Sequence, residues 1–550
     1  MRMTRRAAVL TAATLLLAPV PALAAGPLSG GAGSTTGATA GHATAADALV
    51  SSWPAVPVDQ RLQPYLAEQL AATSGDPLRV MVSGTSTRAA LDAVAAAGLA
   101  VQQTWDAVGV VVAVGPPDAV RAVVGQPGVT YVEGDAELTT TLDTAHTATR
   151  SADALPVFRT AQGSRVDGAG ITIAIIDTGI DSTHPMFQRG GKTTVVRNLR
   201  NICDRLTLAS DTCFQNDPVG DTDTAGGHGT HVAGIAAGVE VTTTGAAPKN
   251  LRGAAPGANL VGFGLGQGLF VVNANAAMNW VVEHQHNPCK SATQQTGPAD
   301  PACPPIRVTN HSYGPSAAPN GNTFNENAAD VRLQRALVAK GVVPVWAAGN
   351  DGGNGSRAVT NPPGMDPTGG VLMVGSYNDA NTGSRDRQMS TFSSRGKAGD
   401  PTTYPDLAAP GDRITSACRL YLPICMTGLA PLNGPGATDV GTFNTISGTS
   451  MAAPYVAGVV AQLFQANPGL TPAQVELILE DTAHQFTSGA PYEPDPRNPG
   501  SDTSFDKGHG LVDVYAALER VLGSPTATVS ASGGSPADGV RDVKGKRVRK

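Results

Sequence analysis

The stretch that most constrains the fold is a short run of β-branched and apolar residues, ITIAII at 171–176. A run of this kind, without polar alternation, is typical of a strand buried on both faces of a parallel sheet. It ends in Asp177-Thr178-Gly179, so a carboxylate follows at the carboxyl end of the strand. Open α/β sheets place their chemistry at that end. The sequence therefore predicts an α/β fold with Asp177 at the functional edge of the sheet.

A second constraint comes from ISGTSMAAPYVA at 446–457. Small and apolar residues from Met451 to Gln465 predict a buried helix, and Pro454 fits its first turn, where a missing N–H costs nothing. Ser450 then lies at a helix N-terminus, beside unpaired backbone N–H groups that can stabilise an oxyanion. A serine cap on a core helix is the alternative for this motif alone, so its partners in the chain must decide.

A histidine motif lies between these two segments. GGHGTHVAGIAAG at 226–238 places His228 between glycines at the start of another small-residue helix. Aspartate, histidine and serine in this order along the chain form one of the three known orders of the acyl-transfer triad. In that triad the aspartate orients the imidazole, which takes the serine proton and later gives it to the leaving amine. We therefore expect Asp177, His228 and Ser450 to act together.

A fourth segment adds an amide. VVPVWAAGNDG at 342–352 predicts an apolar strand that ends at Gly349-Asn350. The side-chain amide of Asn350 can donate to an oxyanion, opposite the backbone N–H of Ser450.

The four motifs resemble those of the subtilisin-like serine peptidases, the subtilase family. The family's motifs are present as IIDTGID, GHGTHVAG, AAGN and GTSMAAP, and the match gives family roles to Asp177, His228, Asn350 and Ser450. Further family landmarks are LRGAAPGANL, VTNHSYG, STFSSRG, DLAAPG and GHGLVDVYAAL. The resemblance covers roughly residues 160–520. It implies a subtilisin-like parallel sheet flanked by helices, and peptide-bond hydrolysis through an acyl-enzyme.

The resemblance also implies a pocket for the residue before the scissile bond. Its walls are Ser312, Tyr313 and Gly314 on one side and Ala347, Ala348 and Gly349 on the other. Main-chain groups of such walls bind the substrate as an added strand. Near the floor, Asn361 falls where relatives often have a glycine. We therefore expect broad cleavage after medium-sized neutral or apolar residues.

No metal or cofactor is expected. His231 lies three residues after His228, but the Glu of a HExxH zinc site is missing, so we interpret His231 as a packed structural histidine. Many subtilases bind calcium through an acidic residue just after the segment that matches 182–185. This chain has Met186 there, which offers no carboxylate to a hard cation.

The N-terminus has the pattern of a secretory signal peptide. Three arginines precede an apolar stretch from Ala7 to Leu17, and Ala22-Leu23-Ala24 is a typical cleavage site. A transmembrane helix is the alternative, but the apolar stretch is too short, and no other segment of about 20 apolar residues is found. A Gly-, Ala-, Ser- and Thr-rich segment follows and predicts a flexible linker. The pattern predicts a secreted, extracellular protein.

Residues 78–138 predict a separate small domain. Strand and helix patterns alternate in the order βαββαβ, which is that of a ferredoxin-like α+β unit. The unit resembles the inhibitory propeptide of the subtilase family, whose last strand has residues much like Tyr131-Val132-Glu133. An independent binding domain is the alternative. By the resemblance, the propeptide inhibits the enzyme within the same chain and is cleaved somewhere in 138–150.

The six cysteines lie in the peptidase region, and an even count behind a signal peptide predicts disulfides, with 15 possible connectivities. Pairing between sequence neighbours is the simplest interpretation, and zinc binding, the alternative, lacks CxxC spacing. The expected pairs are Cys203–Cys213, Cys289–Cys303 and Cys418–Cys425.

The sequence thus predicts a secreted serine endopeptidase made as a zymogen, acting on polypeptides as a monomer. The formal net charge of −6 argues against nucleic-acid binding. A dedicated processing or transpeptidating subtilase and a catalytically silent binding protein are the alternatives. We expect a signal peptide at 1–24, a linker at 25–65, the propeptide at 66–142, the peptidase at 143–523 and a disordered basic tail at 524–550.

Overall fold

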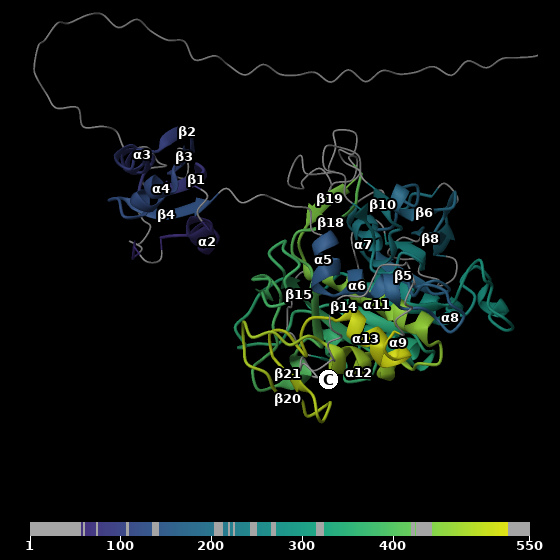
Figure 1. Ribbon diagram of the computed structural model, residues 1–550. Helices are drawn as coiled ribbons and strands as arrows, with labels where there is room; N and C mark the ends of the chain where they lie inside the picture. Colours follow the sequence, from purple (N-terminus) through teal and green to yellow (C-terminus); the bar gives the residue numbers. More distant parts are fainter. Residues whose placement is uncertain are drawn as a thin grey trace, which may run out of the picture. The chain divides into compact units, whose positions relative to one another are not determined.

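The computed structural model of the chain contains two compact units, Met1–Glu137 and Leu138–Lys550 (Figure 1). The described residues are 57–58, 61–72, 75–105, 109–134, 142–202, 213–217, 220–223, 226–242, 250–265, 271–314, 324–419, 424 and 443–525. The predicted signal peptide, most of the predicted linker and nearly all of the predicted basic tail lie outside them.

The first unit is a four-stranded antiparallel sheet with the strand order β2-β3-β1-β4. Its elements are α2 (Pro64–Ala72), β1 (Leu78–Gly84), α3 (Thr87–Ala96), β2 (Ala100–Trp105), β3 (Val110–Gly115), α4 (Pro117–Val124) and β4 (Val129–Gly134). From β1 to β4 they follow one another in the βαββαβ order expected from the sequence.

The hydrophobic core of this unit lies between one face of the sheet and the helices. Val80 and Val82 of β1 are fully buried and pack in one cluster with Val94 of α3 and Val123 of α4. Because side chains alternate along a strand, the residues between them point to the other face. Ser86 caps α3, since its Oγ accepts a hydrogen bond of 3.1 Å from the backbone N–H of the third helical residue.

The second unit is built on a mostly parallel sheet, which confirms the predicted α/β fold class. Among the described residues the sheet has nine strands in the order β16-β15-β14-β13-β5-β12-β8-β9, with β17 beside β15. They are β5 (Thr172–Asp177), β8 (Val195–Asn201), β9 (Phe214–Asn216), β12 (Asn259–Gly264), β13 (Ile306–His311), β14 (Val343–Ala347), β15 (Leu372–Asn378), β16 (Gln388–Met389) and β17 (Leu407–Pro410). Within the described part of this sheet, the pairings of β9 and β16 are antiparallel and the others are parallel.

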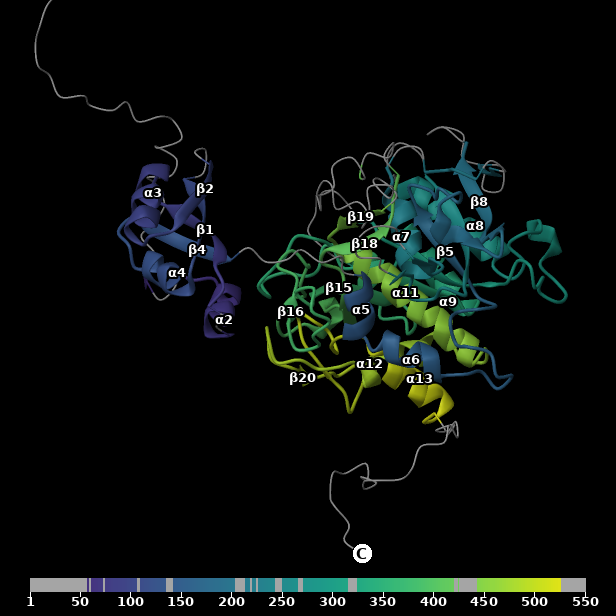
Figure 2. The ribbon, with the colours of Figure 1, turned by 45° about the horizontal axis from the view of Figure 1, so that its top comes forward.

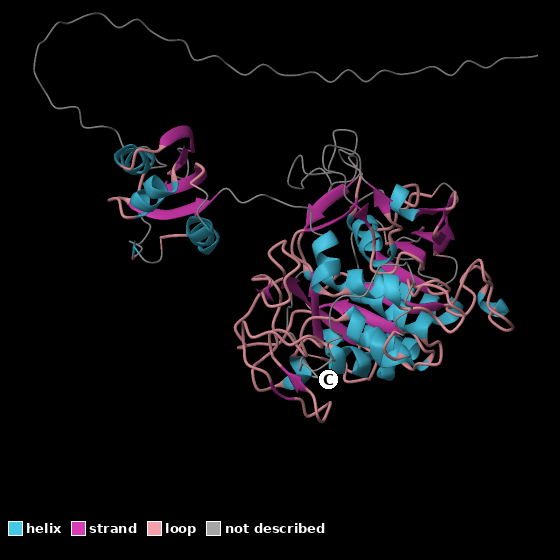
Figure 3. Cartoon of the chain, in the orientation of Figure 1, coloured by secondary structure: helices cyan, strands magenta, loops and turns pink. Residues whose placement is uncertain are grey.

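Helices cover both faces of this sheet (Figure 3). They are α5 (Leu142–Ala148), α6 (Ser151–Val157), α7 (His228–Ala237), α8 (Val271–His284), α9 (Ala329–Ala339), α11 (Thr449–Ala466), α12 (Pro472–Thr482) and α13 (Val514–Leu522). Ile173 and Ile175 of β5 belong to the core cluster that contains α7 and α11. Ala174 and Ile176 belong to the cluster that contains α8 and α9. The continuous apolar run of β5 is therefore explained by burial on both faces.

Shorter elements complete the unit around these layers. They are β6 (Gln188–Arg189), β7 (Lys192–Thr193), β10 (Val241–Thr242), β11 (Asn250–Leu251), β18 (Ile414–Ala417), β19 (Phe443–Ile446), β20 (Glu493–Pro494), β21 (Asp502–Thr503) and the 3₁₀ turns Pro185–Phe187, Ala292–Gln294, Pro362–Met365 and Pro401–Thr403. Figure 2 shows α6 and α13 side by side next to α11.

The predicted buried helix after Ser450 is α11, and it packs closely on α7. Its residues from Met451 to Phe464 are all buried. At Gly458 an added Cβ would lie 2.6 Å from the carbonyl oxygen of Ala236 in α7. Since no side chain fits there, the small residues of both helices allow their close approach.

The predicted disulfide between Cys289 and Cys303 is present. Cys213 and Cys418 are also disulfide-bonded, and their predicted partners, Cys203 and Cys425, lie outside the described residues. No helix in the described part of the chain has the length and apolar character needed to cross a membrane.

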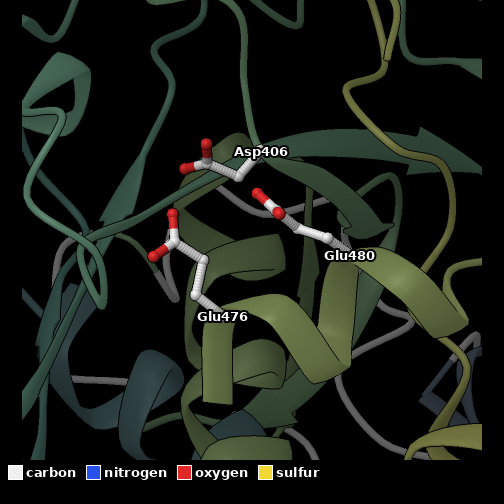
Figure 4. Close-up of side chains that lie close together, drawn as sticks. All are labelled: Asp406, Glu476 and Glu480. Atoms are coloured by element: carbon white, nitrogen blue, oxygen red, sulfur yellow. The ribbon is translucent and has the colours of Figure 1, made fainter. Parts of the chain in front are cut away.

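A cluster of carboxylates lies where α12 meets the start of β17. Oxygen atoms of Asp406, Glu476 and Glu480 lie within 4.8 Å of one another (Figure 4). Such oxygens are the ligands that hard cations prefer. Positive charge is already present, however, because Arg497 Nη1 lies 3.6 Å from Asp406 Oδ1 and His509 Nδ1 lies 3.6 Å from Glu480 Oε1.

Arg497 and His509 also contact a fourth carboxylate, that of Asp495. Negative charge therefore exceeds positive charge in a buried place, which favours proton uptake. Burial raises the pKa of Glu480 to about 7, although His509 opposes the shift. Burial and the charges of Asp406 and Glu480 raise the pKa of Glu476 well above its ordinary value.

This shift predicts a pH dependence of stability. Between the ordinary value of 4.5 and about 7, the folded protein holds the Glu480 proton more tightly than the unfolded chain. The free energy of unfolding therefore falls as the pH rises through this window. Glu480→Gln keeps the oxygen that accepts from Asn498 and removes the charge. At pH 8 the variant should be more stable than the wild type by about 1–3 kcal/mol. At pH 5 this difference in the free energy of unfolding should be smaller, because Glu480 is then protonated in the folded wild type.

Urea unfolding at both pH values measures the difference. Glu493→Gln, at an exposed position of β20, is the control and should follow the wild type. An equal change of stability with pH in the wild type and in Glu480→Gln would contradict the assignment.

Candidate active site

Asp177 and His228 meet at the carboxyl end of β5. Asp177 is the last residue of β5 and is fully buried, and His228 is the first residue of α7. His228 Nδ1 lies 2.8 Å from Asp177 Oδ1 and 3.0 Å from Oδ2. A carboxylate in this position fixes the tautomer of the ring, with the proton on Nδ1 and Nε2 left as a base.

The glycine after His228 is required by this approach. At Gly229 an added Cβ would lie 2.3 Å from the carbonyl oxygen of Gly179. Its backbone N–H donates to Thr178 Oγ1 over 2.9 Å, which fixes the start of α7 against the loop after β5. The sequence motif His-Gly-Thr is thus explained by the close contact of helix and loop.

A second carboxylate stabilises the first turn of α7, and the sequence analysis assigned no role to it. Asp223 is fully buried and accepts hydrogen bonds from Gly227 N, Thr230 N and Thr230 Oγ1, at 2.8, 2.9 and 2.6 Å. Burial by itself lowers the pKa of His228, but the carboxylates of Asp177 and Asp223 raise it above its ordinary value. The two carboxylates therefore stabilise the imidazolium, the form that follows proton transfer from a nucleophile.

Ser450 is the second residue of α11 and exchanges two hydrogen bonds with Ser312. Ser450 Oγ donates to the carbonyl oxygen of Ser312 over 3.0 Å, and Ser312 Oγ donates to the carbonyl oxygen of Ser450 over 2.9 Å. Among the described residues, no hydrogen bond joins Ser450 Oγ to the His228 ring. In the absence of substrate such contacts are often long, and they tighten when the substrate is bound.

Asn350 lies next to the N-terminus of α11. The backbone N–H of Thr449 donates to Asn350 Oδ1 over 2.9 Å, and Thr449 Oγ1 donates to the same oxygen over 3.0 Å. A backbone N–H cannot accept, so the bonded atom is the amide oxygen and Nδ2 is left as a donor. Among the hydrogen bonds of the described residues, neither Asn350 Nδ2 nor the N–H of Ser450 has an acceptor. Both donors are therefore available to an anion.

The two predicted pocket walls are joined by Asn361. Its Nδ2 donates to the carbonyl oxygen of Tyr313 over 2.8 Å and to that of Ala347 over 2.7 Å. The side chain is almost fully buried, and an added Cβ at Gly314 would lie 3.4 Å from its Cγ. Asn361 thus lies between the walls, where it fixes their separation.

The other residues considered for metal binding have apolar or backbone surroundings. His231 is fully buried, and its Nε2 lies 2.9 Å from the carbonyl oxygen of Asn444. Burial lowers the pKa of His231 to about 3, which keeps the ring neutral. Met186 is fully buried, and its side chain offers no oxygen ligand.

Comparison with known proteins assigns the chain to a family. Residues 168–511 match the model described as "Subtilase family" and include all four motif residues. The chain is 30% identical over 362 residues to "Serine protease AprX" of Bacillus subtilis (strain 168), covering 63% of this chain and 68% of that protein. It is 27% identical over 473 residues to "Subtilisin E" of the same organism, covering 82% and 94%.

A solved structure is also similar. It is that of fervidolysin from Fervidobacterium pennivorans, described as a keratinolytic enzyme related to subtilisin. The identity is 23% and the TM-score 0.46, and the match covers 81% of this chain and 61% of that chain.

Proposed function

Because this chain belongs to the subtilase family of serine peptidases, we propose that it is a secreted endopeptidase, made as a zymogen, with the triad Asp177, His228 and Ser450. The observation that supports the triad best is the 2.8 Å contact of His228 Nδ1 with Asp177 at the ends of β5 and α7. Ser450 lies at the N-terminus of a helix within the same family match.

The proposed reaction starts when Ser450 Oγ attacks the carbonyl carbon of a peptide bond. His228 Nε2 takes the hydroxyl proton, and Asp177 stabilises the imidazolium. The oxyanion accepts hydrogen bonds from Asn350 Nδ2 and the N–H of Ser450. His228 then gives the proton to the leaving amine, which leaves an ester on Ser450. Water, deprotonated by the same imidazole, hydrolyses that ester and regenerates the serine.

We propose that the first unit is the inhibitory propeptide and that cleavage precedes α5. Within the expected window of 138–150, α5 contains residues 142–148. Its His146 is buried, with Nδ1 2.9 Å from the hydroxyl of Tyr455 and Nε2 3.0 Å from the carbonyl oxygen of Arg252. A substrate binds as an extended strand, so a bond inside α5 becomes accessible only when these contacts break. Cleavage on the N-terminal side of α5 is therefore favoured over cleavage inside it, and the signal sequence supports secretion of the precursor.

Ser450→Ala should abolish proteolysis and leave the precursor uncleaved. The variant lacks the proposed nucleophile. Loss of the corresponding serine in subtilisin lowers kcat by a factor of about 10⁶. Hydrolysis of an unfolded protein and N-terminal sequencing of the secreted species measure the two effects.

Ser447→Ala is the matched control for this variant. Ser447 lies three residues upstream, and its hydroxyl donates to Asp412 Oδ1. The control should mature and cleave normally. Full peptidase activity in purified Ser450→Ala protein would refute the proposed function.

The pocket predicts a preference for medium-sized neutral residues before the scissile bond. Asn361 is uncharged, and its amide bonds to both walls, so we expect a short pocket that attracts no cation. Asn361→Gly removes this side chain and should raise kcat/KM for Phe relative to Leu by about tenfold. Profiling of both enzymes with a peptide library tests this. A dominant preference for Lys or Arg in the wild type would show that the floor of the pocket is assigned wrongly.

A further inference from the structure

One buried serine bonds the residues on both sides of Asn350. The backbone N–H of Ser394 donates to the carbonyl oxygen of Gly349 over 2.9 Å. The backbone N–H of Asp351 donates to Ser394 Oγ over 3.1 Å. Ser394 is 1% exposed, so water does not compete for these bonds. Its main chain and side chain together hold the turn that follows β14.

A second hydroxyl completes this arrangement. Because Asp351 N–H can only donate, Ser394 Oγ accepts that bond and its own hydrogen is free for Thr360 Oγ1, 2.9 Å away. Both hydroxyls lie against Gly349, where φ is +103° and an added Cβ would come within 2.9 Å of Ser394 Oγ and 1.8 Å of Thr360 Oγ1. The glycine of the AAGN motif is therefore required by this contact and by its backbone conformation.

The side chain of Asn350 is held by a different residue, Thr449. Thr449 donates twice to its Oδ1, and Thr449 Oγ1 also accepts from Gly349 N over 3.2 Å. The direction of Asn350 Nδ2 thus depends on two supports, Ser394 for the backbone and Thr449 for the amide. An oxyanion donor is effective only when it is fixed in advance, because no reorganisation is then needed during the reaction.

We propose that Ser394 is a positioning residue for the oxyanion donor Asn350 and that Thr360 supports it. Ser394 acts through the turn at 349–351. The inference rests on the proposed function, since it assumes that Asn350 stabilises the oxyanion. The serine belongs to the STFSSRG segment at 390–396, a family landmark to which no chemical role was assigned from the sequence.

Ser394→Ala leaves the N–H of Asp351 without its acceptor and loosens the turn. We expect kcat to fall about tenfold with KM unchanged. The weakened interaction is the hydrogen bond from Asn350 to the oxyanion, which is made only in the transition state. Ser393→Ala is the matched control. Ser393 is equally buried, but its Oγ accepts from Ser376 N over 2.9 Å. The control should keep its kcat, and thermal melts compare the stability of both variants.

A double-mutant cycle with Asn350→Ala distinguishes positioning from a general structural effect. Asn350→Ala alone should lower kcat by about 10²–10³, a size known from subtilisin itself. In that background Ser394→Ala should cause no further loss, because the group that it positions is absent. Additive losses, or an unchanged kcat in Ser394→Ala alone, would overturn the proposal.

Thr360→Val enters the same cycle as a second variant, in case Ser394→Ala does not fold. Valine keeps the shape of threonine and removes only the partner of Ser394 Oγ. We expect a smaller fall in kcat that disappears in the Asn350→Ala background, and a loss that persists there would contradict the proposal. If Asn350→Ala alone keeps its kcat, the oxyanion assignment in the proposed function fails, and the cycle separates that result from a failure of Ser394.

Discussion

The site depends on how closely two helices rich in small residues, α7 and α11, pack against each other and against the sheet. His228 is the first residue of α7 and Ser450 is the second residue of α11. The packing of the two helices therefore determines the backbone positions of both residues. Glycines make the approach possible: a Cβ at Gly458 would meet α7, and one at Gly229 would meet the loop after β5. Substitution of either glycine is therefore expected to displace His228 or Ser450 as well as to destabilise the core.

Around these helix starts, polar groups are fixed before any substrate binds. Two buried carboxylates, Asp177 and Asp223, lie near His228, one bonded to its ring and the other to the turn that contains it. Next to Ser450, the amide of Asn350 is bonded through its oxygen, and its N–H donors have no acceptor among the described residues. Negative charge near His228 and donors near Ser450 match the charges that would develop if Ser450 attacked a carbonyl, as in the proposed reaction.

The parallel sheet and the meeting of Asp177 with His228 could be predicted because each has a residue-level signature, whereas the roles of the four motif residues stay predictions. The continuous apolar run at 171–176 predicts a strand buried on both faces of a parallel sheet, and Asp177 follows this run directly. Asp223 and Ser394 were not assigned a role. An acidic residue or a serine in a loop does not reveal which backbone N–H it accepts from, since its partners are fixed only by tertiary packing. The hydrogen bond from Ser450 to the carbonyl oxygen of Ser312 could not be predicted from the sequence for the same reason. Asn361 was placed near the pocket, but its hydrogen bonds to both walls were not predicted.

The most direct test of the account is covalent labelling of the mature enzyme with a fluorophosphonate, followed by peptide mapping with mass spectrometry. The reagent phosphonylates a serine only where a general base and oxyanion donors activate it. We predict one adduct, on Ser450, formed in step with the loss of peptidase activity and absent from a His228→Ala variant. Loss of activity with the adduct on a different residue, or an enzyme that stays fully active with Ser450 labelled, would contradict the account.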